Sequence, residues 1–480
     1  MAISIQTVRH QGLSLWQSAV GRTVRDELEA NNPSSTLHDV LAHPMMQAAN
    51  AHVVADHKNL PIPDQPDRTS TDHHPAISKL RYDMAEAKRT GNTKQYKFLL
   101  QKCRPYATCQ LIHWAKCEAI YLESWLKHGG HPIYYDWDQQ LVDGKPNKDF
   151  SVIEWKLPND GKVAILGDWG TGMDDVKAML EQVMADHAPS AIVHLGDIYY
   201  SGTADEAQKN FVDIFNEVFG NGARVPVFNI PGNHDYYAFG EGFYNTLRQI
   251  NPLSQPGVSQ EEARTWQQAA SYFCLRTEDG LWQLLGMDTS YNDHNPLFQN
   301  KAPSLRSSEI TWHQDKLDNF DGRTILFSHH QFFSANAKIS SDPKNYNHAL
   351  YKVFQPYFDK IAAWFWGHEH NLAAYQNGLL GLAKGRLVGC SAYEESVHED
   401  PYKVNCPSVP YQKIEGKDLR VNREPNTGYF NHGYAVIDLQ RKNPSDPISV
   451  SYYQIPSWNG TTRIPLPPEQ PACLGKETLG

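Results

Sequence analysis

Hydrophobic residues follow two different rhythms along the chain of 480 residues. Between about residues 13 and 129 they recur every three or four positions, which predicts amphipathic helices. The stretch 129–148 is rich in Gly, Pro and Asp and predicts a linker. From about residue 151, short β-branched runs alternate with helical segments, the pattern of an α/β domain with a largely parallel sheet. We therefore expect a mostly α-helical N-terminal domain with its linker (1–150), an α/β domain (151–458) and a Pro-rich C-terminal tail (459–480).

Strand and helix signals alternate through the first part of the α/β domain. Strands are predicted at 162–166, 191–195, 225–230, 281–289, 324–328 and 362–366. Helices are predicted between them, at 174–187, 206–220, 308–320 and 348–361. Further strands are predicted at 379–383, 386–395, 434–440 and 448–455. The alternating pattern therefore gives way to a strand-rich end.

Composition narrows the class of protein. Hydrophobic residues make up 40% and charged residues 20%, which is typical of a globular chain. A net charge of −10, without a long Lys/Arg block, argues against nucleic acid as the main partner. Mean hydropathy is −0.57 and no stretch of about 20 apolar residues occurs, so we expect no membrane span. The first 20 residues lack a secretory pattern, and seven cysteines without close pairs fit reduced thiols, so a cytoplasmic location is expected.

Five predicted strands end in polar clusters that suit metal ions. They are GDWG (167–170), GDIYY (196–200), GNHD (232–235), SHH (328–330) and GHEH (367–370). In α/β sheets the loops beyond the carboxyl ends of strands converge on one crevice, so these clusters are expected to meet. Taken singly, a Gly-Asp pair is more often a turn, and a buried histidine more often belongs to the core. All five in order favour a metal site.

The chemistry of the clusters points to two metal ions. Carboxylate, amide oxygen, phenol and imidazole suit iron, manganese or zinc rather than a thiolate zinc site. The seven candidate ligands are Asp168, Asp197, Tyr200, Asn233, His329, His368 and His370. These are too many for one ion with four to six ligands, whereas two ions about 3.5–4 Å apart would use them all.

This series of clusters resembles the calcineurin-like metallophosphoesterase superfamily and, within it, the purple acid phosphatases. Many members carry Asp-x-His in the first cluster, whereas this chain has Asp-Trp-Gly at 168–170. Purple acid phosphatases share that loss and use the Tyr of Gly-Asp-x-x-Tyr, which corresponds to Tyr200. The sequences GHEHNLAAY and SHHQFFS are similar to the smaller, animal-type enzymes. The resemblance covers about residues 160–455 and implies a four-layer α/β/β/α sandwich; the helical N-terminal region is unrecognised.

The resemblance also implies roles for the candidate ligands. Asp168, Tyr200 and His370 would bind the first metal, and Asn233, His329 and His368 the second. Asp197 would bridge the two, and His234 would be the catalytic acid that protonates the leaving group. A phenolate favours Fe(III), paired with Fe(II), Zn or Mn, although a Mn/Mn or Zn centre stays open.

Substrate contacts are less well marked. The smaller enzymes place a second active-site histidine about nine residues after the ligand equivalent to His329, where this chain has Lys338. His330 and His348 are the candidates to replace it. Tyr237, which follows GNHD, is a candidate for an aromatic wall of the pocket.

The expected function is hydrolysis of a small phosphate ester by a metal-bound hydroxide. A phosphomonoesterase of the acid phosphatase type is favoured. A phosphodiesterase of the same superfamily, acting on nucleotide or lipid head-group diesters, and a non-catalytic scaffold are the alternatives. A dinucleotide-binding loop at Gly167-x-x-Gly170-x-Gly172 is rejected because its spacing is not Gly-x-Gly-x-x-Gly. The sequence does not predict an oligomeric state.

Overall fold

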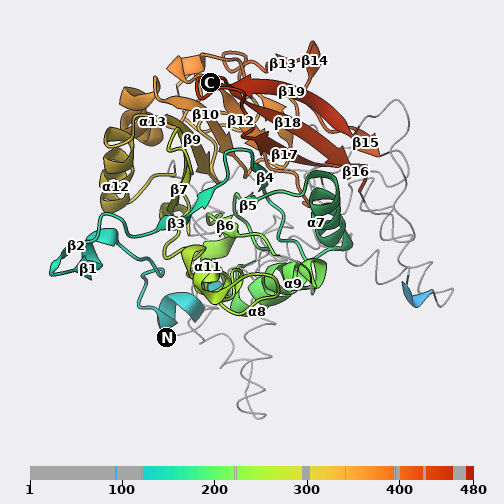
Figure 1. Cartoon of the computed structure of the whole chain (residues 1–480). Coiled ribbons are helices and arrows are strands. Elements are labelled where there is room, and N and C mark those ends of the chain that lie inside the picture. Colours follow the sequence, from blue (N-terminus) through green and yellow to red (C-terminus); the bar gives the residue numbers. More distant parts are fainter. Residues whose placement is uncertain are drawn as a thin grey trace, which may run out of the picture. The chain divides into compact units, whose positions relative to one another are not determined.

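The chain divides into two compact units in the computed structural model. One comprises Met1–His131, Tyr237–Phe239 and Asn295–Gln299, and the other Pro132–Tyr236, Gly240–His294 and Asn300–Gly480. The structure describes residues 92–94, 120–121, 123–199, 201–220, 222, 224–294, 303–340, 342–393, 395, 401–424, 429–457 and 472–480. The predicted helical region 13–129 lies almost entirely outside these residues. The second unit carries the α/β elements, which run from cyan to red in Figure 1.

A six-stranded sheet carries the first half of the α/β pattern. Its order is β19 (Cys473–Leu479), β18 (Ile448–Ile455), β17 (His432–Asp438), β4 (Lys162–Leu166), β5 (Ala191–His194) and β6 (Val227–Asn229). Strands β4, β5 and β6 are parallel, whereas β17 is antiparallel to β4. One face packs on α7 (Asp174–His187), η3 (Gln208–Val212) and α9 (Asp213–Phe219).

A seven-stranded sheet carries the second half. Its order is β11 (Leu372–Ala374), β12 (Gly385–Val388), β10 (Ile361–Trp366), β9 (Arg323–Ser328), β8 (Trp282–Gly286), β7 (Phe273–Thr277) and β3 (Val152–Leu157). Strands β8, β9, β10 and β12 are parallel. One face packs on α12 (Ser307–Asp318) and α13 (His348–Phe354).

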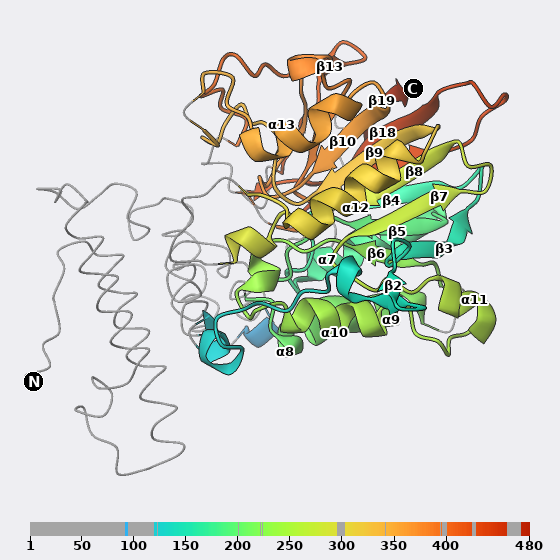
Figure 2. The same cartoon turned by 90° about the vertical axis from the view of Figure 1, so that its left-hand side faces the viewer.

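The other faces of the two sheets share one core. Side chains from both sheets, among them Ile165, Val193, Phe327 and Phe365, form a single buried cluster. Helices cover the outer faces, as the two views in Figure 1 and Figure 2 show. The predicted four-layer α/β/β/α sandwich is therefore confirmed.

Smaller elements fill the connections. They are η2 (Trp137–Gln139), β1 (Leu141–Val142), β2 (Lys145–Pro146), α8 (Ala204–Ala207), η4 (His234–Tyr236), α10 (Glu241–Gln249), α11 (Gln260–Thr265), η5 (Tyr291–Asp293), η6 (Gln355–Tyr357), η7 (Leu379–Gly381), β13 (Lys413–Ile414), β14 (Lys417–Asp418), β15 (Arg423–Glu424) and β16 (Tyr429–Phe430). Within the described residues, no helix is both long and apolar enough to cross a membrane.

Helix α7 shows how the sequence pattern produces these layers. Val176, Met179, Leu180 and Val183 recur at helical spacing and are fully buried against the six-stranded sheet. The helix ends at Ala188, which has a left-handed backbone conformation (φ 44°). Its bounds are those predicted from the sequence.

Several segments differ from the expectation: the strand predicted at 386–395 ends at Val388 as β12, and the helix predicted at 348–361 ends at Phe354 as α13. The strand predicted at 379–383 is wrong: the structure has the short 3₁₀ turn η7, which follows Gly378 (φ 76°) and ends at Gly381 (φ 91°). Such a backbone reverses direction and cannot continue a strand. The stretch predicted as a C-terminal tail ends in β19, which pairs antiparallel with β18.

Candidate dimetal site

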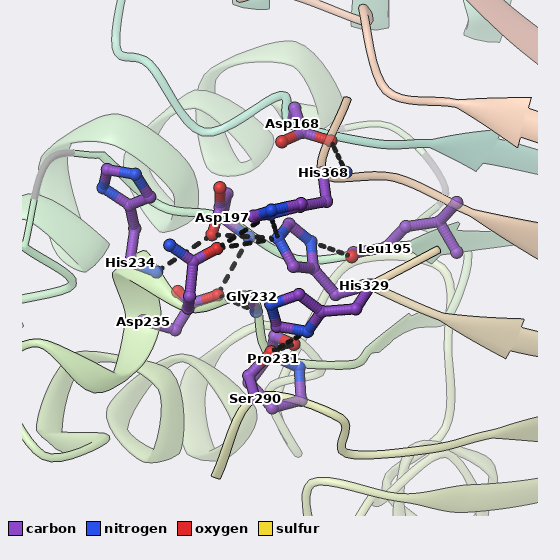
Figure 3. A network of polar contacts seen from close by, with 12 residues as sticks. Asp168, Leu195, Asp197, Pro231, Gly232, His234, Asp235, Ser290, His329 and His368 are labelled. Atoms are coloured by element: carbon purple, nitrogen blue, oxygen red, sulfur yellow. Dashed lines mark hydrogen bonds and ion pairs between the residues drawn. The ribbon is translucent and has the colours of Figure 1, made fainter. Parts of the chain in front are cut away.

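The five polar clusters meet at the carboxyl ends of strands from both sheets. Asp168, Asp197 and Asn233 follow β4, β5 and β6 of the six-stranded sheet. His329 follows β9, and His368 follows β10, of the seven-stranded sheet. Figure 3 shows the side chains of Asp197, His329 and His368 close together, with the ring of His234 turned away from them. The strand ends of the two sheets therefore bring the predicted ligands of both sheets together.

Three of these residues hold an unusual backbone conformation. Asp168 (φ 55°), Asp197 (φ 72°) and His368 (φ 70°) all have positive φ. This region costs a non-glycine residue about 1–3 kcal/mol and is concentrated at functional sites. The strand ends are thus bent to aim side chains into the crevice at some expense of stability.

One group of ligand atoms converges on a single point. His329 Nε2, His368 Nδ1 and Asn233 Oδ1 lie 3.1 Å from one another in each pairing. Asp197 Oδ1 lies 3.5 Å from His329 Nε2. We call these four residues the second-metal group. His329 is fully buried, so solvent does not separate its ring from the other three side chains.

The hydrogen bonding of His329 indicates that this group fits a cation. His329 Nδ1 lies 2.9 Å from the carbonyl oxygen of Leu195, which can only accept, so Nδ1 carries the proton. In the neutral form that a metal ligand must take, Nε2 carries a lone pair, and it faces the amide oxygen of Asn233, which only accepts. Two acceptors at this separation repel unless a positive ion lies between them. The donor set therefore fits a metal ion.

A second group forms beside the first. Asp168 Oδ1 accepts a hydrogen bond from the Tyr199 hydroxyl at 2.9 Å and lies 3.5 Å from His370 Nε2. The Tyr199 oxygen is also 3.1 Å from His370 Nε2. Asp168, Tyr199 and His370 are called the first-metal group. Tyr200, the phenol expected here, lies outside the described residues.

Charge connects the two groups. Burial would raise the pKa of Asp197, but His329, His234 and His368 hold it below its usual range. Asp168, Asp197 and His329 also bring one ligand atom each within 4.8 Å of one another. Asp197 therefore lies close to a residue of each group; its bridging role stays a prediction.

Burial keeps Tyr199 protonated in the metal-free site. The pKa of its phenol is well above the ordinary value, because the ring is buried and because Asp168 and Asp197 add negative charge. A phenolate at this position needs a cation to balance that charge.

Asp235 fixes the loops that carry the ligands. Its buried carboxylate accepts backbone N–H bonds from Gly232 (2.7 Å), Asp197 (2.9 Å) and Ile198 (3.2 Å). Gly232 is also required for space, since an added Cβ would lie 2.0 Å from Asp197 Oδ1. The loops after β5 and β6 are thus fastened to each other.

His234 lies next to the two groups. Its backbone N–H donates to Asp197 Oδ1 at 3.1 Å, and its ring centroid is 4.7 Å from that of Tyr199. Its side chain is half-buried, so it can meet a substrate in the crevice.

The predicted substrate contacts are dispersed. His330 is buried, with Nδ1 3.0 Å from Thr289 Oγ1 and Nε2 3.0 Å from Asp293 Oδ2, so both ring nitrogens already have protein partners. His348 starts α13 and contacts Tyr346 and Asp342. Tyr237 belongs to the first unit and is buried. Lys338 is exposed.

Sequence reasoning missed two residues of the first-metal group's surroundings. The Tyr393 ring stacks on His370 with centroids 3.6 Å apart. Glu395 Oε2 lies 3.9 Å from His370 Nδ1. Both follow β12, and the only sequence signal was the polar run SAYEE after that strand.

Comparison with known proteins finds a family model that matches part of the α/β region. Residues 161–372 match the family model described as calcineurin-like phosphoesterase. That segment contains β4 to β10 and all the predicted metal ligands. Over these residues the α/β/β/α part of the chain is therefore similar to calcineurin-like phosphoesterase domains.

Individual relatives are distant. The chain is 24% identical over 156 residues to the human (Homo sapiens) cyclic GMP-AMP phosphodiesterase SMPDL3A, covering 31% of this chain and about a third (34%) of that protein. A dimetal phosphatase structure from Danio rerio matches with a TM-score of 0.38 at 13% identity, covering 62% of this chain and 96% of that one. The structure of PhoD matches with a TM-score of 0.32 at 13% identity, covering 63% and 70%.

Proposed function

We propose that the protein is a phosphomonoesterase whose first-metal group includes a phenol. The observation that supports this most is the position of Tyr199, whose oxygen lies 2.9 Å from Asp168 Oδ1 and 3.1 Å from His370 Nε2. A phenol in place of the histidine of Asp-x-His is the feature by which the sequence resembles purple acid phosphatases. We assign the phenol to Tyr199, in place of the Tyr200 that the resemblance implies.

The two groups would share the work of holding metal and substrate. Asp168, Tyr199 and His370 would hold the first cation, Asn233, His329 and His368 the second, and Asp197 both. When bound, two adjacent cations neutralise phosphoryl oxygens and supply a water that is deprotonated near neutral pH. A phenolate is a hard ligand that favours Fe(III) in the first position, with Fe(II), Zn or Mn in the second.

The protein's own residues complete the reaction. The alcohol that leaves from phosphorus needs a proton, and His234 is the half-buried imidazole beside both groups. We propose that it gives this proton, a contribution typically worth about 10²–10⁴ in rate. Asp235 and Gly232 keep the loop of His234 in register with Asp197.

A phosphodiesterase is the second candidate. It is favoured by the name of the human relative, a cyclic GMP-AMP phosphodiesterase, which matches part of this domain. The two candidates share the same metal groups and differ in what the substrate presents beside them.

Paired substrates distinguish the candidates. We expect kcat/KM for nitrophenyl phosphate to exceed that for bis(nitrophenyl) phosphate by about 10-fold or more, equivalent to about 1.4 kcal/mol of transition-state stabilisation. The Asp197→Asn variant, purified identically, must lose both activities, which excludes a contaminating phosphatase. A preference for the diester that Asp197→Asn abolishes would replace the first candidate by the second.

A further inference from the structure

The loop between β6 and α10 carries two residues of the site. Asn233 belongs to the second-metal group, and His234 opens η4, which ends at Tyr236. A small displacement of this loop would move the proposed acid relative to the metals. The contacts that fix the position of this loop therefore affect the rate of the acid step.

Asp288, just after β8, holds this loop on both sides of Asn233 and His234. The Tyr236 hydroxyl donates to Asp288 Oδ2 at 2.6 Å. At the other end, Ser290 Oγ donates to the Pro231 carbonyl at 2.8 Å, a contact drawn in Figure 3. Ser290 is itself held by its backbone N–H, which donates to Asp288 Oδ1 at 2.9 Å. One buried carboxylate thus holds the loop directly at Tyr236 and, through Ser290, at Pro231.

Glu309 of α12 connects Asp288 to a more distant segment. The Asp288 N–H donates to Glu309 Oε1 at 2.8 Å, and the Tyr134 hydroxyl donates to Glu309 Oε2 at 2.6 Å. His313 Nε2 lies 3.2 Å from Glu309 Oε1. Asp288, Glu309 and His313 have no exposed surface. Water therefore cannot replace a lost partner without a rearrangement.

Tyr134 belongs to a segment that is fastened on α12. Asp136 forms an ion pair with Arg306 at 2.9 Å, and Trp137 Nε1 donates to the Ser308 carbonyl at 2.7 Å. The Arg306 guanidinium lies 4.7 Å from the centroid of the Tyr134 ring. Residues 132–137 begin the second unit and follow directly on His131 of the first. We call them the docking segment.

Burial shifts the ionisation of the groups in this chain of contacts. Burial, and then the charge of Glu309, raise the pKa of Asp288 to about 7. Burial raises the pKa of Glu309 to about 8. The pKa values of Tyr134 and Tyr236 are also well above the ordinary value, chiefly through burial, so both hydroxyls stay protonated and donate.

We propose that Tyr134, Glu309 and Asp288 form a positioning relay that makes the placement of His234 depend on the docking segment. These residues touch neither metal nor substrate; they act through Tyr236 and Ser290. The inference rests on the proposed role of His234 as the acid. Through this relay, the attachment of the docking segment to α12 would control the rate of the acid step.

Tyr134→Phe tests the relay at its far end. The variant removes one hydroxyl and leaves the ligands untouched. We expect two metals per chain and an unchanged KM, with kcat reduced about 5-fold for an alkyl phosphate and little for nitrophenyl phosphate. Only the poor leaving group needs the proton, so a merely structural role would not produce this split.

Two further variants serve as the control and as a second test of the relay. Tyr452→Phe removes another buried hydroxyl bonded to a glutamate, Glu477 Oε1 at 2.8 Å, outside the relay, and should leave both rates unchanged. Asp136→Asn loosens the docking segment without touching Glu309 and should reproduce the split. If Tyr134→Phe does not fold, the Asp136→Asn variant alone tests the relay.

A cycle with His234→Ala separates the two hypotheses. In that background, Tyr134→Phe should have no further effect, because the acid is already absent. If His234→Ala lowers the alkyl phosphate rate selectively but neither Tyr134→Phe nor Asp136→Asn does, the relay is refuted and the acid stands. If His234→Ala lowers both rates equally, the acid role fails and the relay fails with it.

Discussion

Glu477 of β19 provides a quantitative test of how the C-terminal strand is held. Its carboxylate accepts hydrogen bonds from Arg386 Nε at 2.6 Å and from Arg386 Nη2 at 2.7 Å. Lys384 Nζ lies 2.7 Å away, and Tyr452 donates at 2.8 Å. Arg386 lies in β12 of the seven-stranded sheet, so this ion pair joins the two sheets. Because Arg386 is fully buried, Glu477→Gln would leave a buried guanidinium without its counter-charge.

The magnitude follows from the ionisation of Glu477. Burial alone would raise its pKa, but the hydrogen bonds and charges of Arg386 and Lys384 lower it from 4.5 to about 2. A lowered folded-state pKa stabilises the fold above pH 4.5, and this stabilisation is lost as the pH falls through 2. The difference corresponds to about 3.4 kcal/mol at pH 7 and about 1.4 kcal/mol at pH 3. Breaking a buried ion pair costs a similar amount, about 3–5 kcal/mol.

Urea unfolding of the unchanged protein and of the Glu477→Gln variant at pH 7, 5, 4 and 3 measures this contribution to the free energy of unfolding. We expect Glu477→Gln to be less stable by about 3 kcal/mol at pH 7, with the gap narrowing toward pH 3. Asp205→Asn, which removes the exposed pair with Lys209, should cost less than about 1 kcal/mol and serves as the control. A gap at pH 7 below about 1 kcal/mol, or one independent of pH, would refute the reasoning.

Three further predictions concern the metal groups. Gly232→Ala should lower metal content and turnover while preserving the circular dichroism spectrum, because its Cβ would lie 2.0 Å from Asp197 Oδ1; an unchanged metal content would contradict this. Asp197→Asn should abolish metal binding and turnover together, and a variant that keeps two metals and near-normal turnover would remove the bridging role. In iron-loaded protein, Tyr199→Phe should abolish the visible phenolate charge-transfer band and Tyr200→Phe should retain it; the opposite result would make Tyr200 the ligand.

Much of the site could be predicted because strand ends carry local signals. Clusters such as Gly-Asn-His-Asp combine small residues with ligands directly after an apolar run, and parallel strands bring such ends together. This reasoning located Asp168, Asn233, His329 and His368 in one crevice. It required no knowledge of the order of strands within either sheet.

The remaining features depend on geometry that the sequence does not display. That the Tyr199 hydroxyl reaches Asp168 Oδ1 depends on the path of the loop after β5, which residue type does not specify. Tyr393 reaches His370 only because β12 pairs with β10, a neighbour that local patterns do not specify. The Glu309–Asp288 contact likewise joins a helix and a strand end through long-range packing.

Metal titration of the chelated full-length protein tests the central claim most directly. Phosphate release from nitrophenyl phosphate is followed while iron with zinc, or manganese, is added in fractions of an equivalent. We predict no turnover without metal and a rise that levels off at two ions per chain, with Asp197→Asn inactive throughout. Turnover in the metal-free protein, or a plateau at one ion, would contradict the dimetal account.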